Sequence, residues 1–454
     1  MGSLAERARA KPKPEKRAPQ IGRRSGKQAN KPSFPLDWSA ATPSGVGPTP
    51  RVLVLDGETN PAVATVRSLS RSGYYVEVGA TARWSKAGLS RYCRARFTYA
   101  DPENNPQQFI ADLLERIAKQ SRALIMPMTD RTTLPISLHR EQIVGAGGIV
   151  ALAPHETILQ AIDKESVRHL AQSIGIATPE TFVVDSRVQA RAIAERISYP
   201  VVLKSRFSQE SCRDGRFRTT QRARYAKQPD EFLRMYEWLR HGCNSVLIQE
   251  FIAGVSAGYS ALVSHGEVRA DFAHLRLRDV NPIGSGSALR LSIQPSAALR
   301  HAGSSLLRAL GWHGVAMVEF KIRSDGTPVL VEVNGRFWGS LALAIEAGVD
   351  FPVLAARMAQ NMTFEGPPRY RTGLRCRWLL GDLLHLIRVW RGKPREYPGD
   401  FPNRWRALAE FMTPVRGTCH DNFRIDDPLP ELGDWLQALR RVTAFPAHAP
   451  VMRD

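Results

Sequence analysis

The chain has 454 residues, of which 43% are hydrophobic and 23% charged, an ordinary balance for a globular protein with a sizeable core. Five scattered cysteines without Cys-x-x-Cys spacing argue against a zinc ribbon or a disulfide framework, and so favour the cytoplasm. The net charge of +20 raises nucleic acid, anionic lipid and an anionic substrate such as ATP as candidate partners.

Residues 1–50 hold ten Lys or Arg, three Asp or Glu and eight prolines, with few large apolar residues. This composition predicts a disordered basic tail. The tail has no aromatic interleaving for base stacking, so no specific nucleic-acid partner is expected. No apolar run approaches the ~18–20 residues that span a bilayer, so no transmembrane segment is expected.

Residues 51–153 alternate strands and helices, which predicts a parallel α/β layer. Strands are expected at 51–55, 74–79, 123–128 and 149–152, and helices at 61–72 and 109–119. No Gly-x-Gly-x-x-Gly follows the first strand. The layer is therefore interpreted as Rossmann-like but without a dinucleotide.

Residues 154–361 read as an α+β domain and residues 362–454 as a mostly helical C-terminal region. In the α+β domain, strands are expected at 199–204, 245–252, 260–263, 315–321 and 328–334, and helices at 164–174, 188–197, 296–310 and 339–360. In the C-terminal region, helices are expected at 377–391, 403–412 and 430–442. No chemistry is assigned to that last region.

Charged residues interrupt three of the apolar strands: Lys204, Glu319 and Glu332. Taken singly, each fits a solvent-facing strand position or half of a salt bridge. The Ser-Asp-Gly turn at 324–326 predicts a hairpin that brings Glu319 near Glu332, with Asn334 on the same face. Two carboxylates and an amide oxygen suit Mg²⁺, and Lys204 would supply a cation for phosphate.

The segment Val331-Glu-Val-Asn-Gly-Arg-Phe-Trp-Gly-Ser340 resembles the metal-binding signature of ATP-grasp enzymes, particularly the carbamoyl-phosphate-synthase-like branch. The resemblance implies that Glu319, Glu332 and Asn334 bind Mg²⁺, or Mn²⁺ in its place. It also implies that Arg336 stabilises the reacting phosphoryl or acyl phosphate group.

Further segments are similar to the family in the family's order, over roughly residues 50–360. Lys164 and Lys204 correspond to its two nucleotide-phosphate lysines, and Ile248–Gly254 resembles the adenine hinge, with Gln249, Glu250, Phe251 and Ile252 as nucleotide contacts. The implied fold is a Rossmann-like layer followed by two α+β subdomains that clamp ATP, with a helical C-terminal extension. The loop 205–224 departs from the family, since it has one glycine and six arginines.

The resemblance implies an ADP-forming carboxylate–amine ligase that uses ATP and Mg²⁺ on a small-molecule carboxylate and an amine, and it is compatible with a homodimer. Two alternatives stay open. Bicarbonate could replace the organic carboxylate, giving carboxylase or carbamoyl-phosphate chemistry. The chain could also be a non-catalytic ATP-binding protein or one that binds through its basic surface.

The segment from Ala273 to Arg290 is the candidate substrate loop. Arg276 and Arg278 alternate with leucines on one predicted strand, and paired arginines suit a carboxylate. Ser285, within Gly284-Ser-Gly-Ser287, and Arg290 complete the candidate set. The alternative is a solvated strand edge followed by a flexible turn.

Overall fold

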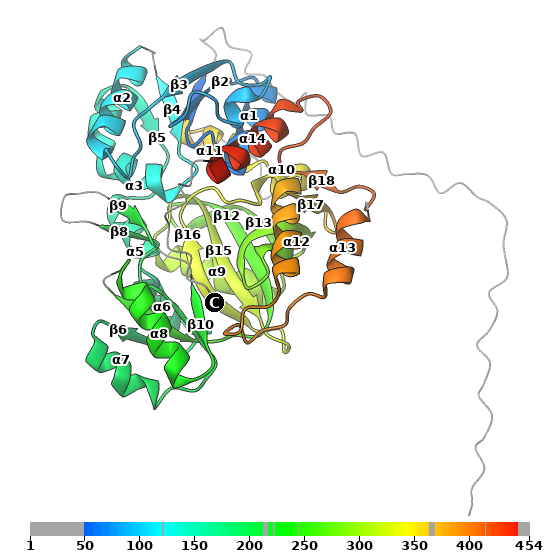
Figure 1. Cartoon of the computed structure of the whole chain (residues 1–454). Coiled ribbons are helices and arrows are strands. Elements are labelled where there is room, and N and C mark those ends of the chain that lie inside the picture. Colours follow the sequence, from blue (N-terminus) through cyan, green and yellow to red (C-terminus); the bar gives the residue numbers. More distant parts are fainter. Residues whose placement is uncertain are drawn as a thin grey trace, which may run out of the picture. The chain divides into compact units, whose positions relative to one another are not determined.

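The computed structural model describes residues 50–119, 122–211, 217–220, 223–243, 245–362, 368–413 and 415–443 (Figure 1). The predicted disorder of the basic tail falls on residues that lie outside this description, apart from Pro50. The described residues all belong to one compact unit. No described helix has the length and apolar character needed to cross a membrane.

The N-terminal layer is a five-stranded parallel sheet in the order β3-β2-β1-β4-β5. Its strands are β1 Arg51–Val54, β2 Tyr75–Ala80, β3 Ala95–Thr98, β4 Ala123–Met126 and β5 Gly148–Val150. Its helices are α1 Asn60–Arg71, η1 Ala87–Leu89, α2 Pro106–Ala118, α3 Asp130–Leu138 and α4 Arg140–Gly145. The predicted parallel layer is confirmed. The sequence pattern missed β3, a short edge strand that lies half in solvent.

The next subdomain is built on an antiparallel sheet in the order β10-β7-β11-β6. Its strands are β6 Thr181–Val184, β7 Val201–Ser205, β10 Arg224–Ala226 and β11 Val246–Glu250, and β8 Gln209–Ser211 pairs with β9 Phe217–Thr219 as a separate ribbon. Its helices are α7 Arg187–Ala194 and α8 Pro229–Arg240, whereas α5 His155–Ile162 and α6 Lys164–Ser173, which precede them in the chain, pack against β16 (Pro328–Asn334) of the largest sheet. Helices α7 and α8 pack together, and α8 covers β7 and β10.

The largest sheet has seven strands in the order β16-β15-β12-β13-β14-β17-β18. They are β12 Val255–Ser264, β13 Glu267–Asn281, β14 Ser285–Ile293, β15 Gly314–Ile322, β16 Pro328–Asn334, β17 Arg375–Arg377 and β18 Cys419–His420. The remaining helices are α9 Ala297–Ala309, α10 Leu341–Ala347, α11 Phe351–Ala359, α12 Leu379–Arg391, α13 Arg404–Met412 and α14 Leu429–Thr443.

Two sequence-based expectations need adjustment in this part of the chain. The single helix expected at 339–360 is two helices, because Gly348 ends α10 with a φ of 119° and the Asp350 side chain accepts a hydrogen bond from the Val353 N–H at the start of α11. The C-terminal region has the three expected helices, but it also contributes β17 and β18 to the large sheet.

The predicted hairpin is confirmed, and it contains a bulge at the point of interest. Strands β15 and β16 are antiparallel, and Glu319 lies directly opposite Glu332. The register shifts by one residue there, because Phe320 pairs with Leu330 and leaves Val331 as an extra residue. This bulge is what places the two carboxylates opposite each other on one face.

Candidate active site

The site begins with two carboxylates on the β15–β16 hairpin. Glu319 and Glu332 form an opposed pair, and both side chains are largely buried. Asn334, two residues along β16, donates from Nδ2 to Glu319 Oε1 at 3.3 Å. The three side chains singled out as metal ligands therefore gather at one place.

Two lysines from other elements reach the same place. Lys204 lies near the end of β7, and its Nζ donates to the Val331 carbonyl, on the bulge, at 3.4 Å. Lys164 is the first residue of α6, and its Nζ donates to Ser208 Oγ at 2.8 Å. A small pocket between α6, β11 and β16 is lined by Lys164, Gln249 and Glu332.

An ion pair joins the start of α6, where Lys164 lies, to the chain that follows Lys204 on β7. Arg206, two residues after Lys204, pairs with Asp163 at 2.6 Å, and its carbonyl accepts the Lys164 N–H at 3.1 Å. The Asp163 side chain also accepts the Glu165 N–H as the N-cap of α6. These contacts fix the start of α6 against the chain that follows β7.

Buried charges of both signs perturb one another across the site. Burial lowers the pKa of Lys204 to about 8, and the nearby Lys164 acts in the same direction. Burial raises the pKa of Glu319, with Glu332 adding to that effect and Arg276 opposing it. Burial alone would raise the pKa of Glu332, but Lys164, Lys204 and Arg276 together lower it.

This arrangement fits a divalent cation. Burial raises the pKa of Glu319 although Arg276 opposes the shift, and a metal ion held between the carboxylates would favour the charged form. No group of three or more His, Cys, Asp or Glu side chains in the described chain is placed to hold a metal. Two carboxylates and an amide leave coordination positions for phosphate oxygens and water, which is how proteins usually bind Mg²⁺.

Arg336 is held rigidly at the edge of this cluster. It donates to Asn334 Oδ1 at 2.9 Å, to the Phe337 carbonyl at 2.9 Å and to Asp130 Oδ2 at 3.2 Å. Asp130 is the first residue of α3, so the N-terminal layer contributes directly to the site. The carboxylate of Asp130 also acts to raise the pKa of Lys164, against the lowering effect of burial.

The expected adenine hinge lies at the end of β11. Gln249 is buried and donates to Thr181 Oγ1 at 3.0 Å. Glu250 is exposed, and its carboxylate pairs with Arg323 at 3.3 Å. The Phe251 N–H already donates to the Pro200 carbonyl at 3.2 Å. Of the two backbone N–H groups in the expected hinge, that of Ile252 is therefore the candidate to pair with adenine.

The four candidate substrate residues do not all gather at the carboxylates. Arg276 does, with its guanidinium 2.5 Å from Glu319 Oε1. A shift in strand register after Arg276 separates it from Arg278, which pairs at 2.7 Å with the buried Asp382 of α12. Arg290 is fully buried and pairs with Asp421 at 2.6 Å. Ser285 begins β14 and pairs in register with Asn281.

Sequence reasoning missed Asp130, Asp163 and Arg206 as residues that position the site. A signal existed for Asp130, because polar residues directly after a parallel strand lie at the edge of the sheet where ligands usually bind. Asp163 and Arg206 carry no such signal, since only the folded chain shows that they pair.

Comparisons with known proteins agree with this architecture. Residues 243–381 match a family described as ATP-grasp in the biosynthetic pathway with Ter operon. The chain is 26% identical over 230 residues to the carbamoyl phosphate synthase large chain, N-terminal section, of Methanopyrus kandleri, covering 48% of this chain and 39% of that protein. It is 26% identical over 292 residues to the corresponding section from Aquifex aeolicus, covering 58% and 50%. The chain thus spans half or less of the length of these relatives.

Solved structures share the fold at low sequence identity. A biotin carboxylase complex from Campylobacter jejuni matches with a TM-score of 0.57 at 12% identity, covering 70% of this chain and 72% of that one. An L-amino acid ligase from Bacillus licheniformis matches with a TM-score of 0.53 at 16% identity, covering 69% and 75%. N5-carboxyaminoimidazole synthetase from Staphylococcus aureus in complex with ADP matches with a TM-score of 0.54 at 12% identity, covering 71% and 80%.

A parallel layer followed by two mainly antiparallel sheets defines the fold class of this chain. By the family model over residues 243–381, by its distant relatives and by its fold, the chain is similar to proteins of the ATP-grasp superfamily. The resemblance stated from its motifs is confirmed at that level.

Proposed function

We propose that the chain is an ADP-forming ligase that uses ATP and Mg²⁺ to activate a carboxylate, which an amine then attacks. The observation that supports this most directly is the opposition of Glu319 and Glu332 beside two buried lysines. That cluster gathers the charges needed to bind a metal–triphosphate, and it lies next to the rigidly held Arg336.

Each side chain has a role in the proposed reaction. Lys164 and Lys204 would bind phosphate oxygens, and the segment Gln249–Ile252 would hold adenine. Glu319, Glu332 and Asn334 would hold Mg²⁺, which neutralises phosphate charge when bound. Arg336 would stabilise negative charge on the transferred phosphoryl group.

The bond changes are those of acyl phosphate chemistry. A carboxylate oxygen attacks the γ-phosphorus, the bond to the β,γ-bridging oxygen breaks, and ADP leaves. The amine attacks the acyl carbon and expels inorganic phosphate, with loss of a proton from nitrogen. Catalysis of the first step needs positioning and fixed charge, not a protein nucleophile.

Arg276 is the side chain proposed to meet the substrate carboxylate. It is the only one of the four candidate substrate residues whose guanidinium, in the described structure, contacts a candidate metal ligand. Arg276 is also paired with a carboxylate, but its partner Glu319 is a proposed metal ligand, and Mg²⁺ would compete with Arg276 for it. Arg278 and Arg290 pair with Asp382 and Asp421, which lie outside the proposed metal site, so we leave both out of the proposed substrate contacts.

The test is ADP release from Mg²⁺-ATP with pools of amino acids and other carboxylates, each with and without added amines. We expect one pool to stimulate release and Glu332→Gln to lower the stimulated rate by about a hundredfold or more. Glu267→Gln is the matched control, because Glu267 is an exposed glutamate of β13 that pairs only with Arg308 at 3.5 Å.

Three outcomes would contradict the proposal. They are an undiminished rate in Glu332→Gln, no binding of Mg²⁺-ATP, and stimulation by bicarbonate alone. The last would point to carboxylase or carbamoyl-phosphate chemistry in place of ligation to an organic carboxylate.

A further inference from the structure

The C-terminal helices expose an unusual amount of apolar surface. On α12 and α13, Ile387, Trp390, Trp405 and Met412 are 39%, 42%, 68% and 67% exposed. Trp390 and Trp405 contact each other edge to face, with ring centroids 5.4 Å apart. Large apolar patches of this kind on a protein surface mark interaction sites.

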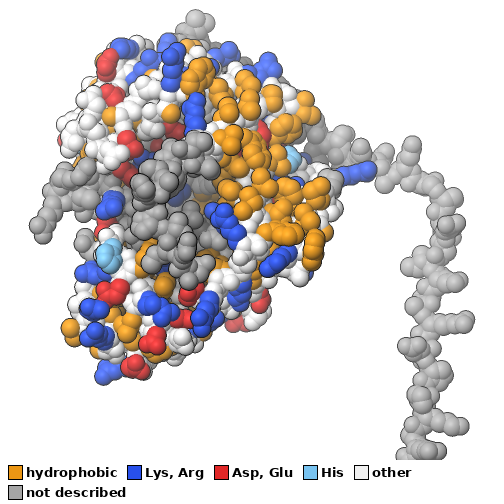
Figure 2. All heavy atoms as spheres, in the orientation of Figure 1, with side chains coloured by type: hydrophobic (Ala, Val, Ile, Leu, Met, Phe, Trp, Pro, Cys, Tyr) orange, Lys and Arg blue, Asp and Glu red, His pale blue; other side chains and the backbone are white. Residues whose placement is uncertain are grey.

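The patch is hollowed and continuous with further apolar surface. An open hollow of about 510 Å³ is lined by Leu386, Ile387, Trp390, Arg391 and Leu408. Figure 2 shows hydrophobic side chains gathered on the side of the molecule where Figure 1 draws α12, α13 and α14. On α14, Leu432 and Leu436 are also exposed apolar side chains.

The surroundings of the patch are basic. Residues 388–406, from the last turn of α12 to the first turn of α13, contain six Arg or Lys and two Asp or Glu. Arg391, Lys393, Arg395 and Arg404 are all exposed. An apolar centre with indole rings and a cationic rim matches the interface of an anionic lipid bilayer, where Trp lies at the headgroup level and Arg or Lys meets lipid phosphate.

From this geometry we propose that the α12–α13 patch docks on an anionic membrane surface. A second copy of the chain fits less well, because a two-fold contact would set one cationic rim against another. The chain's own segment 1–49 fits less well for the same reason, since it too is basic. The rim charge is complementary to a surface of lipid phosphates.

Contacts on the inner face of α12 connect the proposed docking surface to the candidate active site. Asp382 of α12 pairs with Arg278, and His385 bonds the Asp279 carbonyl through Nδ1 at 2.6 Å. Arg388 donates to the Val280 carbonyl at 2.8 Å. The helix that would rest on lipid therefore also holds the strand that carries Arg276.

The test is co-sedimentation of the full chain with phosphatidylcholine vesicles, with and without phosphatidylglycerol, at physiological salt. We expect binding to the anionic vesicles only, with a blue shift of tryptophan fluorescence. The double variant Trp390→Ala, Trp405→Ala should lower the partition coefficient by about tenfold or more. The matched control is Trp84→Ala, because Trp84 is 49% exposed and stacks against Arg83 and Arg96 on the N-terminal layer.

A second variant keeps the test valid if the tryptophan pair does not fold. Arg391→Glu with Arg404→Glu reverses the rim charge on exposed side chains and should abolish binding to the anionic vesicles. Binding that is unchanged in both double variants would show that other basic segments bind lipid, and would overturn the proposal. So would equal binding to neutral vesicles, no binding at all, or a wild-type dimer that the tryptophan variant makes monomeric.

Discussion

At the scale of a single residue, the burial of Lys204 opposes the positive charge that its proposed role requires. Its proposed role, binding phosphate, requires a charged ammonium group. Burial and the neighbouring Lys164 both disfavour that charge and lower its pKa to about 8. Nucleotide binding should therefore depend on pH in a range where an ordinary lysine would not titrate.

We expect the affinity for Mg²⁺-ADP to fall as the pH rises from about 7 to about 9, toward a tenfold loss per pH unit above the lysine pKa. Below pH 8 the ammonium is largely protonated, and above it the neutral amine no longer attracts phosphate. Titration calorimetry across this range measures the effect, and binding should take up protons near pH 8.

The control for this prediction is Lys204→Arg, which keeps a positive charge throughout the range because the guanidinium does not titrate there. Its affinity should be nearly independent of pH. If the arginine variant shows the same pH profile as the wild type, a group other than Lys204 is responsible.

At the scale of elements, the hairpin shows what the sequence could and could not predict. The Ser-Asp-Gly turn and two alternating strands were enough to predict β15 and β16. Their turn also predicted that Glu319 lies near Glu332, but not the register that sets the two directly opposite, because closing the hairpin at Ile322 and Pro328 in a regular ladder would set Val331 opposite Glu319. A bulge corrects this, and the aliphatic Val331 carries no sequence signal for one.

The substrate arginines show the same limit. The strand that carries Arg276 and Arg278 was predicted correctly, but the partners of Arg278 and Arg290 lie 104 and 131 residues further along the chain. A strand pattern specifies which residues share a face, and it contains no information about the ion pairs that a distant segment will form. The partners of Arg278 and Arg290 lie outside the proposed metal site, whereas Arg276 pairs with Glu319, a proposed metal ligand.

Helix α3 provides the element-scale prediction, since its first residue, Asp130, orients Arg336. Asp130→Asn removes the charge that holds the guanidinium at 3.2 Å but leaves the helix start intact. We expect kcat to fall by roughly tenfold while KM for ATP changes less, because Asp130 bonds Arg336 directly and acts on Lys164 only through its charge.

The matched control for α3 is Asp101→Asn. Asp101 belongs to the same layer and pairs with Arg131 at 2.7 Å, away from Arg336. Its variant should keep both constants. Equal losses in kcat and in stability for the two variants would show that Asp130 acts only through folding.

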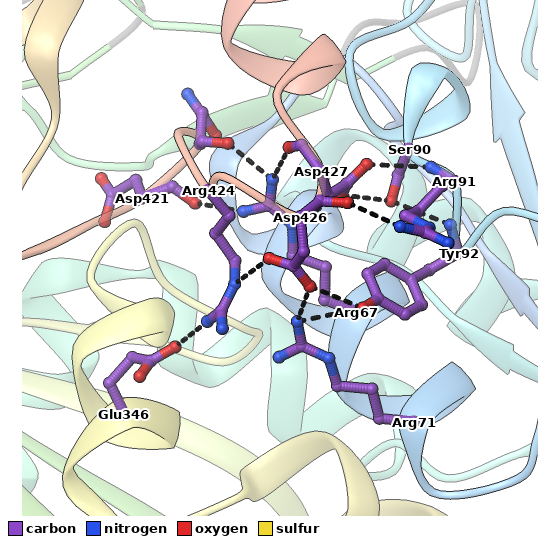
Figure 3. Close-up of polar contacts among 11 residues, drawn as sticks. Arg67, Arg71, Ser90, Arg91, Tyr92, Glu346, Asp421, Arg424, Asp426 and Asp427 are labelled. Carbon is purple, nitrogen blue, oxygen red and sulfur yellow. Dashed lines mark hydrogen bonds and ion pairs between the residues drawn. The ribbon is translucent and has the colours of Figure 1, made fainter.

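On the scale of the whole molecule, the C-terminal segment before α14 contacts the N-terminal layer (Figure 3) and, through Asp421, the large sheet. Arg67 of α1 donates to Asp427 Oδ2 at 2.8 Å and to the carbonyls of Asp421 and Asn422. The Asp421 carboxylate in turn pairs with Arg290 of β14. This C-terminal segment thus links two layers that both contribute residues to the candidate site.

Asp427 and its neighbour Asp426 allow this link to be tested with matched variants. Asp427 is 1% exposed and also accepts bonds from Ser90 Oγ and the Arg91 N–H, whereas Asp426 is 42% exposed and pairs with Arg71. Asp427→Asn should lower the free energy of unfolding by about 3 kcal/mol, because it leaves the buried Arg67 without its counter-charge. Asp426→Asn should cost under about 1 kcal/mol, since water screens an exposed pair. Urea unfolding of both variants measures the two losses in free energy of unfolding. Equal losses would show that the buried pair of Arg67 and Asp427 does not stabilise the contact between the layers more than an exposed pair does.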